Sequence, residues 1–314
     1  MTGSSLDGNE LVVSEEVLEG LQPHQALKRL TIREYNGVRS PSWLQAQLLS
    51  NLITLELENC TAWEDLSCIG QLPNLKNLYV KGKPAVKQVS HGLNQGKCFP
   101  SLEELLFGDM PEWEEWSWAD GRQFCVTASL SSLEISQCAE PLWLPVKEFK
   151  ELTSLAKLSI RSCPKLLSMA RDGDNDILFP PSIDELVLFD CGNLGKLLPG
   201  CLHNLTSLTR LEIGDCRSKE TLPETSLLHL KRLECLKIWK CGELRSKDEL
   251  LQNEGNKQVE GSSVTELCID DTALFKLSLL GRILPSVRAL TISNFPGATM
   301  SDEEQLLRSL TALR

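Results

Sequence analysis

Twelve cysteines and four histidines are the side chains of this 314-residue sequence best suited to bind a metal ion or attack a substrate. No two cysteines have the C-x-x-C spacing of metal and redox sites, and no two histidines have a metal-ligand spacing. The patterns H-E-x-x-H and G-x-S-x-G, which mark zinc proteases and serine hydrolases, are also missing. The sequence therefore predicts a protein that is not an enzyme, with no cofactor, no metal site and no small-molecule substrate.

An acidic segment, residues 172–176 (DGDND), begins like the loop of a helix–loop–helix calcium site. The sixth position of such a loop needs glycine for its sharp turn, and the twelfth needs a bidentate glutamate. This sequence has Ile177 and Ile183 at those two positions. We therefore interpret the segment as a solvated turn.

Six of the cysteines close one nine-residue pattern, L-x-x-L-x-I-x-x-C, with leucine or isoleucine at its first, fourth and sixth positions. The strict copies are Leu52–Cys60, Leu130–Cys138, Leu155–Cys163, Ile183–Cys191, Leu208–Cys216 and Leu233–Cys241. Looser copies begin at Leu27, Leu75, Leu102, Val264 and Val287, and a shortened one begins at Leu310. Full copies begin 23 to 31 residues apart, and this pattern with a period in the twenties is typical of leucine-rich repeats.

The pattern predicts an α/β solenoid, a leucine-rich-repeat horseshoe of about 11 to 12 repeats with a parallel β-sheet on its concave face. Because side chains alternate across a strand, we expect Leu211 and Ile213 to face the core and Arg210, Glu212 and Gly214 to face outward. The returns on the convex side should be mostly irregular or short-helical. The ninth position should turn inward, where cysteine serves as a small buried side chain.

The repeats define the domain boundaries, with an N-terminal flank at 1–26 and the solenoid at 27–314. We expect a short helix at Glu15–Gln22, stopped by Pro23, and a last repeat that is truncated at Arg314. A net charge of −11 and a pI near 5.0 argue against nucleic acid as a partner, because phosphate binding needs a basic surface. No apolar run reaches the roughly 20 residues of a membrane span, and the amino terminus lacks the features of a signal peptide. We therefore expect a cytoplasmic protein whose thiols stay reduced.

Three segments are more specific than a generic repeat: VLEGLQPHQALKRLTIREYNGVRSPSWL at 17–44, IGQLPNLKNLYVKG at 69–82 and FPSLEELLFGDMPEWEEW at 99–116. Together with the ninth-position cysteine they resemble the repeat region of plant intracellular immune receptors of the coiled-coil, nucleotide-binding (NB-ARC) type. The resemblance covers nearly the whole chain, and it implies recognition of a pathogen effector and restraint of a nucleotide-driven switch. The phosphate loop G-x-x-x-x-G-K-[ST] is missing, so nucleotide binding is not carried over to this chain. The chain is then either a receptor fragment or a stand-alone relative of one.

A protein partner should bind the outward third, fifth and seventh repeat positions, where most residues are small or charged. Outward apolar and aromatic side chains indicate a contact surface there, unless neighbouring residues cover them. We expect such a surface at Arg161, Val187, Phe189, Arg210, Glu212, Lys237 and Trp239, with a second group at Tyr79 and Leu106. The partner would be a pathogen effector or the receptor's own nucleotide-binding module. The alternative is the substrate-recognition adaptor of a ubiquitin ligase, which would need a helical docking box that residues 1–26 are too short to hold.

Overall fold

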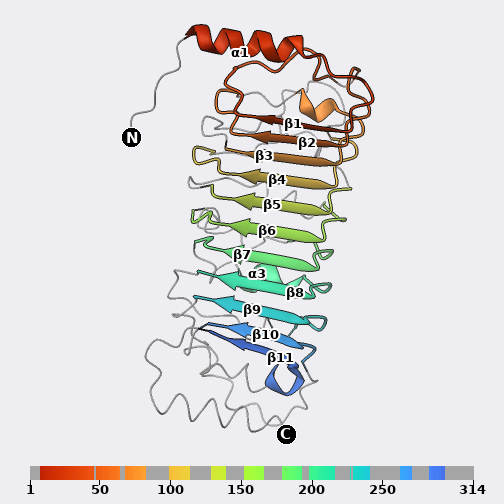
Figure 1. Ribbon diagram of the computed structural model, residues 1–314. Coiled ribbons are helices and arrows are strands. Elements are labelled where there is room, and N and C mark those ends of the chain that lie inside the picture. Colours follow the sequence, from red (N-terminus) through yellow and green to blue (C-terminus); the bar gives the residue numbers. More distant parts are fainter. Residues whose placement is uncertain are drawn as a thin grey trace. The chain divides into compact units, whose positions relative to one another are not determined.

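The computed structural model describes residues 8–45, 47–63, 68–82, 99–113, 129–138, 152–165, 179–192, 198–215, 227, 229–240, 262–270 and 283–293. The chain forms two compact units, Met1–Leu155 and Ala156–Arg314. Within each unit the strands follow one another in chain order in a parallel β-sheet, and every strand begins at the third position of a repeat (Figure 1). The predicted leucine-rich-repeat solenoid with a parallel sheet is therefore confirmed.

The first unit contains five strands in its described part: β1 (Arg29–Arg33), β2 (Thr54–Glu58), β3 (Asn77–Lys81), β4 (Glu104–Gly108) and β5 (Ser132–Ser136). Equivalent repeat positions pair with each other, so that Leu55 lies beside Leu78 and Leu78 beside Leu105. A 3₁₀ turn, η1 (Ile69–Gln71), leads back toward β3. Parallel strands need such return segments because a tight hairpin turn reverses the chain direction.

The second unit contains six strands in its described part: β6 (Lys157–Arg161), β7 (Glu185–Phe189), β8 (Arg210–Gly214), β9 (Cys235–Trp239), β10 (Glu266–Ile269) and β11 (Ala289–Ile292). Its short return helices are α3 (Leu198–His203) and the 3₁₀ turn η6 (Leu284–Ser286). Equivalent positions again pair, so one repeat position forms a straight row across neighbouring strands.

An N-terminal helix, α1 (Gly8–Gly20), precedes β1 (Figure 1). It begins seven residues before the expected helix at Glu15–Gln22, and it ends before Pro23 as expected. The Glu15 carboxylate accepts hydrogen bonds from the backbone N–H groups of Val38 and Arg39 at 2.8 and 3.1 Å, and the Trp43 indole donates to the Leu18 carbonyl at 2.9 Å. The helix is therefore held by the loop of the first repeat, a tertiary contact that a local pattern does not reveal.

The core consists of the fourth and sixth repeat positions, which are buried in every strand from β2 to β10. Leu211 and Ile213 are both fully buried, while Glu212 between them is only half-buried. A fully buried leucine or isoleucine contributes roughly 1.5–3 kcal/mol to folding relative to an exposed one. Stacking many repeats makes this contribution continuous along each unit.

The eighth repeat position ends each strand with a left-handed residue. Its φ angle is positive at all nine described repeats in which this residue lies, for example +56° at Asn59, +50° at Asp190 and +47° at Lys240. In seven of these nine repeats the backbone N–H of this residue donates to the seventh-position carbonyl of the next repeat, as Asp190 does to Gly214 at 2.9 Å. This kink reverses the side-chain alternation, and the ninth residue therefore turns inward.

The ninth-position cysteines are buried as predicted at Cys60, Cys138, Cys163 and Cys191, whereas Cys216 and Cys241 lie outside the described residues. The Cys191 thiol donates to the Ile160 carbonyl of the preceding repeat at 3.2 Å. Burial raises the pKa of this thiol well above its ordinary value. The thiols thus satisfy backbone carbonyls that the turn leaves inside the core.

Candidate protein-binding surface

The outward residues of the second unit form rows across β6 to β11 because equivalent positions lie side by side. In the seventh-position row, Phe189, Gly214 and Trp239 are neighbours on β7, β8 and β9. A Cβ atom on Gly214 would lie 2.4 Å from Cδ2 of Phe189 and 3.4 Å from Cβ of Trp239. The Phe189 ring therefore leans over the glycine and occupies the space that a side chain would need, so Gly214 is buried between two aromatic residues.

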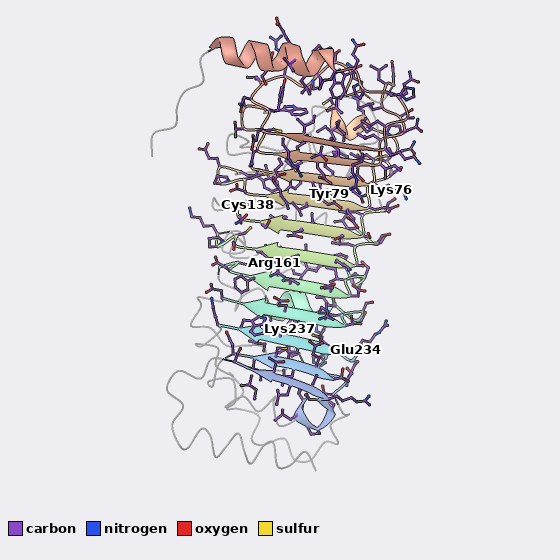
Figure 2. All side chains as sticks on the ribbon, in the orientation of Figure 1. Lys76, Tyr79, Cys138, Arg161, Glu234 and Lys237 are labelled. Atoms are coloured by element: carbon purple, nitrogen blue, oxygen red, sulfur yellow. The ribbon has the colours of Figure 1, made fainter. Side chains whose placement is uncertain are left out.

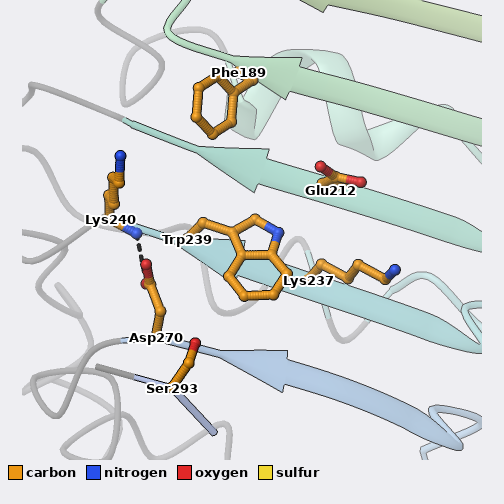
Figure 3. Close-up of a pocket in the computed structure, with 7 residues that line it drawn as sticks. All are labelled: Phe189, Glu212, Lys237, Trp239, Lys240, Asp270 and Ser293. Atoms are coloured by element: carbon orange, nitrogen blue, oxygen red, sulfur yellow. Dashed lines mark hydrogen bonds between the residues drawn. The ribbon is translucent and has the colours of Figure 1, made fainter. Parts of the chain in front are cut away.

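Both aromatic residues line a pocket of about 420 Å³ on the outer face of the sheet (Figure 3). The residues that line it are Phe189, Glu212, Lys237, Trp239, Lys240, Asp270 and Ser293. Four of them were predicted site residues, namely Phe189, Glu212, Lys237 and Trp239. The structure thus brings the two aromatic residues and two of the charged residues of the predicted surface together.

Sequence reasoning missed three lining residues, Lys240, Asp270 and Ser293. Asp270 is only 7% exposed, and its Oδ1 accepts a hydrogen bond from the backbone N–H of Lys240 at 2.5 Å. Asp270 and Ser293 occupy the seventh position of the looser repeats that begin at Val264 and Val287. Following the seventh position through these repeats would have identified both residues.

The sequence predicted that Val187 contributes an exposed apolar side chain to this surface. In the structure Val187 is buried, with 4% exposure. Its neighbours in the row are Ser159 on β6 and Glu212 on β8. Arg161 on β6 and Glu212 on β8 form an ion pair at 3.6 Å, which reaches across β7 between them. This pair joins a seventh-position residue to a fifth-position one and, with the adjoining side chains, covers Val187, so packing between neighbouring rows explains its burial.

Arg210 also lies apart from the pocket, because it occupies the third position of β8 and Gly214 the seventh. Four residues of a β-strand span roughly 13 Å. The guanidinium Nη1 of Arg210 donates a hydrogen bond to the Cys235 sulfur at 3.3 Å. Burial raises the pKa of that thiol to about 11, although the charge of Arg210 opposes the rise.

Tyr79 and Leu106 are neighbours in the fifth-position row of the first unit (Figure 2 labels Tyr79). The Tyr79 hydroxyl donates to the Glu104 carboxylate at 2.5 Å. Burial and this carboxylate raise the pKa of Tyr79 to about 12. The pair is half-buried, its polar atom is bonded within the sheet, and neither residue lines the pocket that Phe189 and Trp239 share.

No group of three or more histidine, cysteine or acidic side chains that could hold a metal ion occurs in the described part of the chain. The calcium-like segment at 172–176 lies outside that part. Among the helices described, none is long and apolar enough to cross a membrane. The described outer face of the sheet has a pocket lined by aromatic and charged side chains, and such a surface is suited to binding another protein.

Comparison with known proteins concerns the repeats and their fold. The family described as R13L1/DRL21 leucine-rich repeats matches residues 4–83. The putative disease resistance RPP13-like protein 1 of Arabidopsis thaliana is 28% identical over 249 residues, which are 68% of this chain and 23% of that protein. The putative disease resistance protein RGA1 of Solanum bulbocastanum is 29% identical over 208 residues, 65% of this chain and 21% of that protein.

The chain therefore spans about a fifth of the length of these relatives. Among solved structures, a leucine-rich-repeat protein of Leptospira interrogans aligns with a TM-score of 0.50 at 17% identity, over 96% of this chain and 73% of that one. That likeness concerns the fold alone. The chain is thus a leucine-rich-repeat protein whose repeats are similar to those of plant disease-resistance proteins, which confirms both the fold and the resemblance predicted from the sequence.

Proposed function

We propose that this chain is a non-enzymatic recognition module of plant innate immunity that acts in the cytoplasm by protein–protein contact. Its partner is a pathogen effector or the nucleotide-binding module of a receptor that carries such repeats. In the second case the contact restrains the nucleotide-driven switch. The resemblance to disease-resistance proteins supports the immune role, and the outer face of the second unit supports the mode of binding.

The observation that carries the proposal is the placement of Phe189 and Trp239 on either side of Gly214. Both rings are half-buried, and they line one pocket together with charged groups. Aromatic residues beside a pocket are typical of the few residues that dominate the energy of a protein interface. Their partial exposure on a sheet face is otherwise unfavourable, because apolar surface in water promotes non-specific association.

The test is the double variant Phe189→Ala with Trp239→Ala in the 314-residue chain. We expect binding to a co-expressed nucleotide-binding module or effector in leaf tissue to weaken at least about thirtyfold, since loss of one such residue costs about 2 kcal/mol or more. If the module is the partner, the double variant should also release cell death in the absence of a pathogen. Binding strength is read by quantitative co-precipitation and cell death by ion leakage.

A matched control removes two exposed apolar side chains outside the sheets, with Leu21→Ala and Val38→Ala. These residues are 66% and 47% exposed, so their loss removes similar apolar surface without touching the pocket. The control variant should bind and restrain as the unaltered chain does. The proposal fails if the double pocket variant is also indistinguishable from the unaltered chain in both measurements.

A further inference from the structure

Asp270 is the charged group of the pocket that lies deepest in the protein. Its side chain faces the pocket from the end of β10, and the residue is more than nine-tenths buried. One carboxylate oxygen accepts the backbone N–H of Lys240, and no other donor within the described residues bonds to this carboxylate. A buried carboxylate is costly unless a positive charge or further donors accompany it. The second oxygen of Asp270 is therefore available to a ligand.

The other charged side chains of the pocket are already matched or directed elsewhere. Lys237 forms an ion pair with Glu266 at 3.7 Å, and Glu212 forms one with Arg161 at 3.6 Å. The Lys240 side chain extends away from Asp270 (Figure 3). The uncompensated charge inside the pocket is consequently negative, and its ligand should carry a positive charge.

The aromatic residues restrict the kind of cation. The Trp239 ring lies along β9 between the ends of the pocket, with Glu212 on one side and Asp270 on the other (Figure 3). A guanidinium is planar, stacks on indole rings and offers five N–H donors, whereas an ammonium is a compact and strongly hydrated charge. Asp270 and the Ser293 hydroxyl can both accept such donors at the same end of the pocket.

We propose that the pocket receives an arginine side chain from the surface of a protein partner, with its guanidinium against Asp270 and its plane on Trp239. This inference rests on the proposed function, because it names the chemistry that the recognition surface selects. The net charge of −11 favours the approach of a basic protein segment over an acidic one.

The experiment titrates the 314-residue chain with three capped pentapeptides, Ala-Ala-X-Ala-Ala, in which X is arginine, citrulline or norleucine. Citrulline has the shape of arginine without the charge, and norleucine keeps only an apolar stem. Binding is followed by the NMR signal of the Trp239 indole N–H, which is assigned by its loss in Trp239→Phe. We expect a saturable shift with the arginine peptide and about tenfold weaker binding of the other two.

Asp270→Asn provides the decisive variant because the asparagine oxygen can still accept the Lys240 N–H while the charge is removed. It should lower the affinity for the arginine peptide to that of the citrulline peptide. Glu185→Gln is the matched control, because this carboxylate lies on the same face at the third position of β7 and pairs with Lys157 at 3.6 Å. The control should leave the affinity for the arginine peptide unchanged.

The arginine assignment would be overturned by equal binding of the arginine and citrulline peptides, by no effect of Asp270→Asn, or by no saturable shift with any peptide. Preferential binding of the norleucine peptide would also overturn it, but it would leave the surface as a protein-recognition site for an apolar side chain. Failure of the proposed function itself appears in a different measurement, the co-precipitation of the Phe189→Ala and Trp239→Ala variant.

Discussion

Gly192→Ala should destabilise the second unit more than an ordinary surface substitution does. Gly192 follows the buried Cys191 and has a φ angle of +81°, a conformation that residues with a side chain rarely adopt. A Cβ atom at this position would lie 2.1 Å from the carbonyl oxygen of Pro164 and 3.2 Å from its carbonyl carbon. Because these are backbone atoms, the strain cannot be relieved by rotating a side chain.

The magnitude follows from two terms. A left-handed backbone costs a residue with a Cβ roughly 1–2 kcal/mol, and relieving an overlap in a packed region costs roughly 1–3 kcal/mol. Gly192→Ala should therefore lower the free energy of unfolding by about 2–5 kcal/mol. Gly82→Ala in the first unit is a matched comparison, because its φ is +66° but the nearest obstacle is the Asn59 side-chain oxygen at 2.1 Å, which can rotate away. Its cost should be about 1–2 kcal/mol.

Urea unfolding followed by circular dichroism compares the two variants with the unaltered chain. Repeat arrays can unfold in parts, so hydrogen exchange should accompany it. The amides to follow are those of Ser162 and Asp190, which donate to Phe189 and Gly214 at 2.8 and 2.9 Å. Gly192→Ala should accelerate their exchange and Gly82→Ala should not. Equal losses of stability in the two variants would refute the argument that the Pro164 carbonyl is a rigid obstacle.

Two further predictions concern the core. Leu211→Ala should lower the free energy of unfolding by about 2–5 kcal/mol and Glu212→Ala by about 0–1 kcal/mol, because the first side chain is fully buried and the second joins a partly exposed ion pair. Equal losses in urea unfolding would contradict the inward and outward assignment. Burial raises the pKa of Cys201 from 9.0 to about 12 and that of Cys235 to about 11, so the native state retains protons that the unfolded state loses above about pH 9. Stability should therefore fall between about pH 9 and pH 12, which urea midpoints measured across that range would show, and rapid alkylation of native Cys201 near pH 8, read by mass spectrometry, would count against this burial.

The interior of the fold could be predicted because the leucine spacing specifies it repeatedly. Leu211 and Ile213 are two apart on a strand, so both must share a face, and the same spacing in each repeat makes the inward face unambiguous. The left-handed eighth position was not predicted, although several of its residues, such as Asn59, Asp109 and Asp190, are types that tolerate positive φ. The residue types at the eighth position are compatible with a positive φ angle, but the backbone angles were needed to establish that conformation.

The outer face was harder to predict because alternation assigns a side chain to a face without saying what covers it. Val187 faces outward and is nevertheless buried, since Arg161 and Glu212 pair across its strand from two different repeats. Arg210 shares that face but lies at the other end of its strand from the pocket. The first outcome depends on how far long side chains reach between rows, and the second on where along the strand the pocket lies. The spacing of residues within one repeat specifies neither of these.

A recognition site in such a sheet is therefore best sought along a row, at one repeat position, and not along the chain. Charged side chains on neighbouring strands neutralise each other between rows, as Lys237 at a fifth position does with Glu266 at a third position, and a neutralised pair offers little selectivity to a partner. Selectivity arises where a row is interrupted, and Gly214 interrupts the seventh-position row between two aromatic residues. The same row then continues to Asp270, whose buried carboxylate lacks a matching cation within the described sheet. A site built from one interruption and one unmatched charge can change its ligand by single substitutions in that row while the leucine core stays the same.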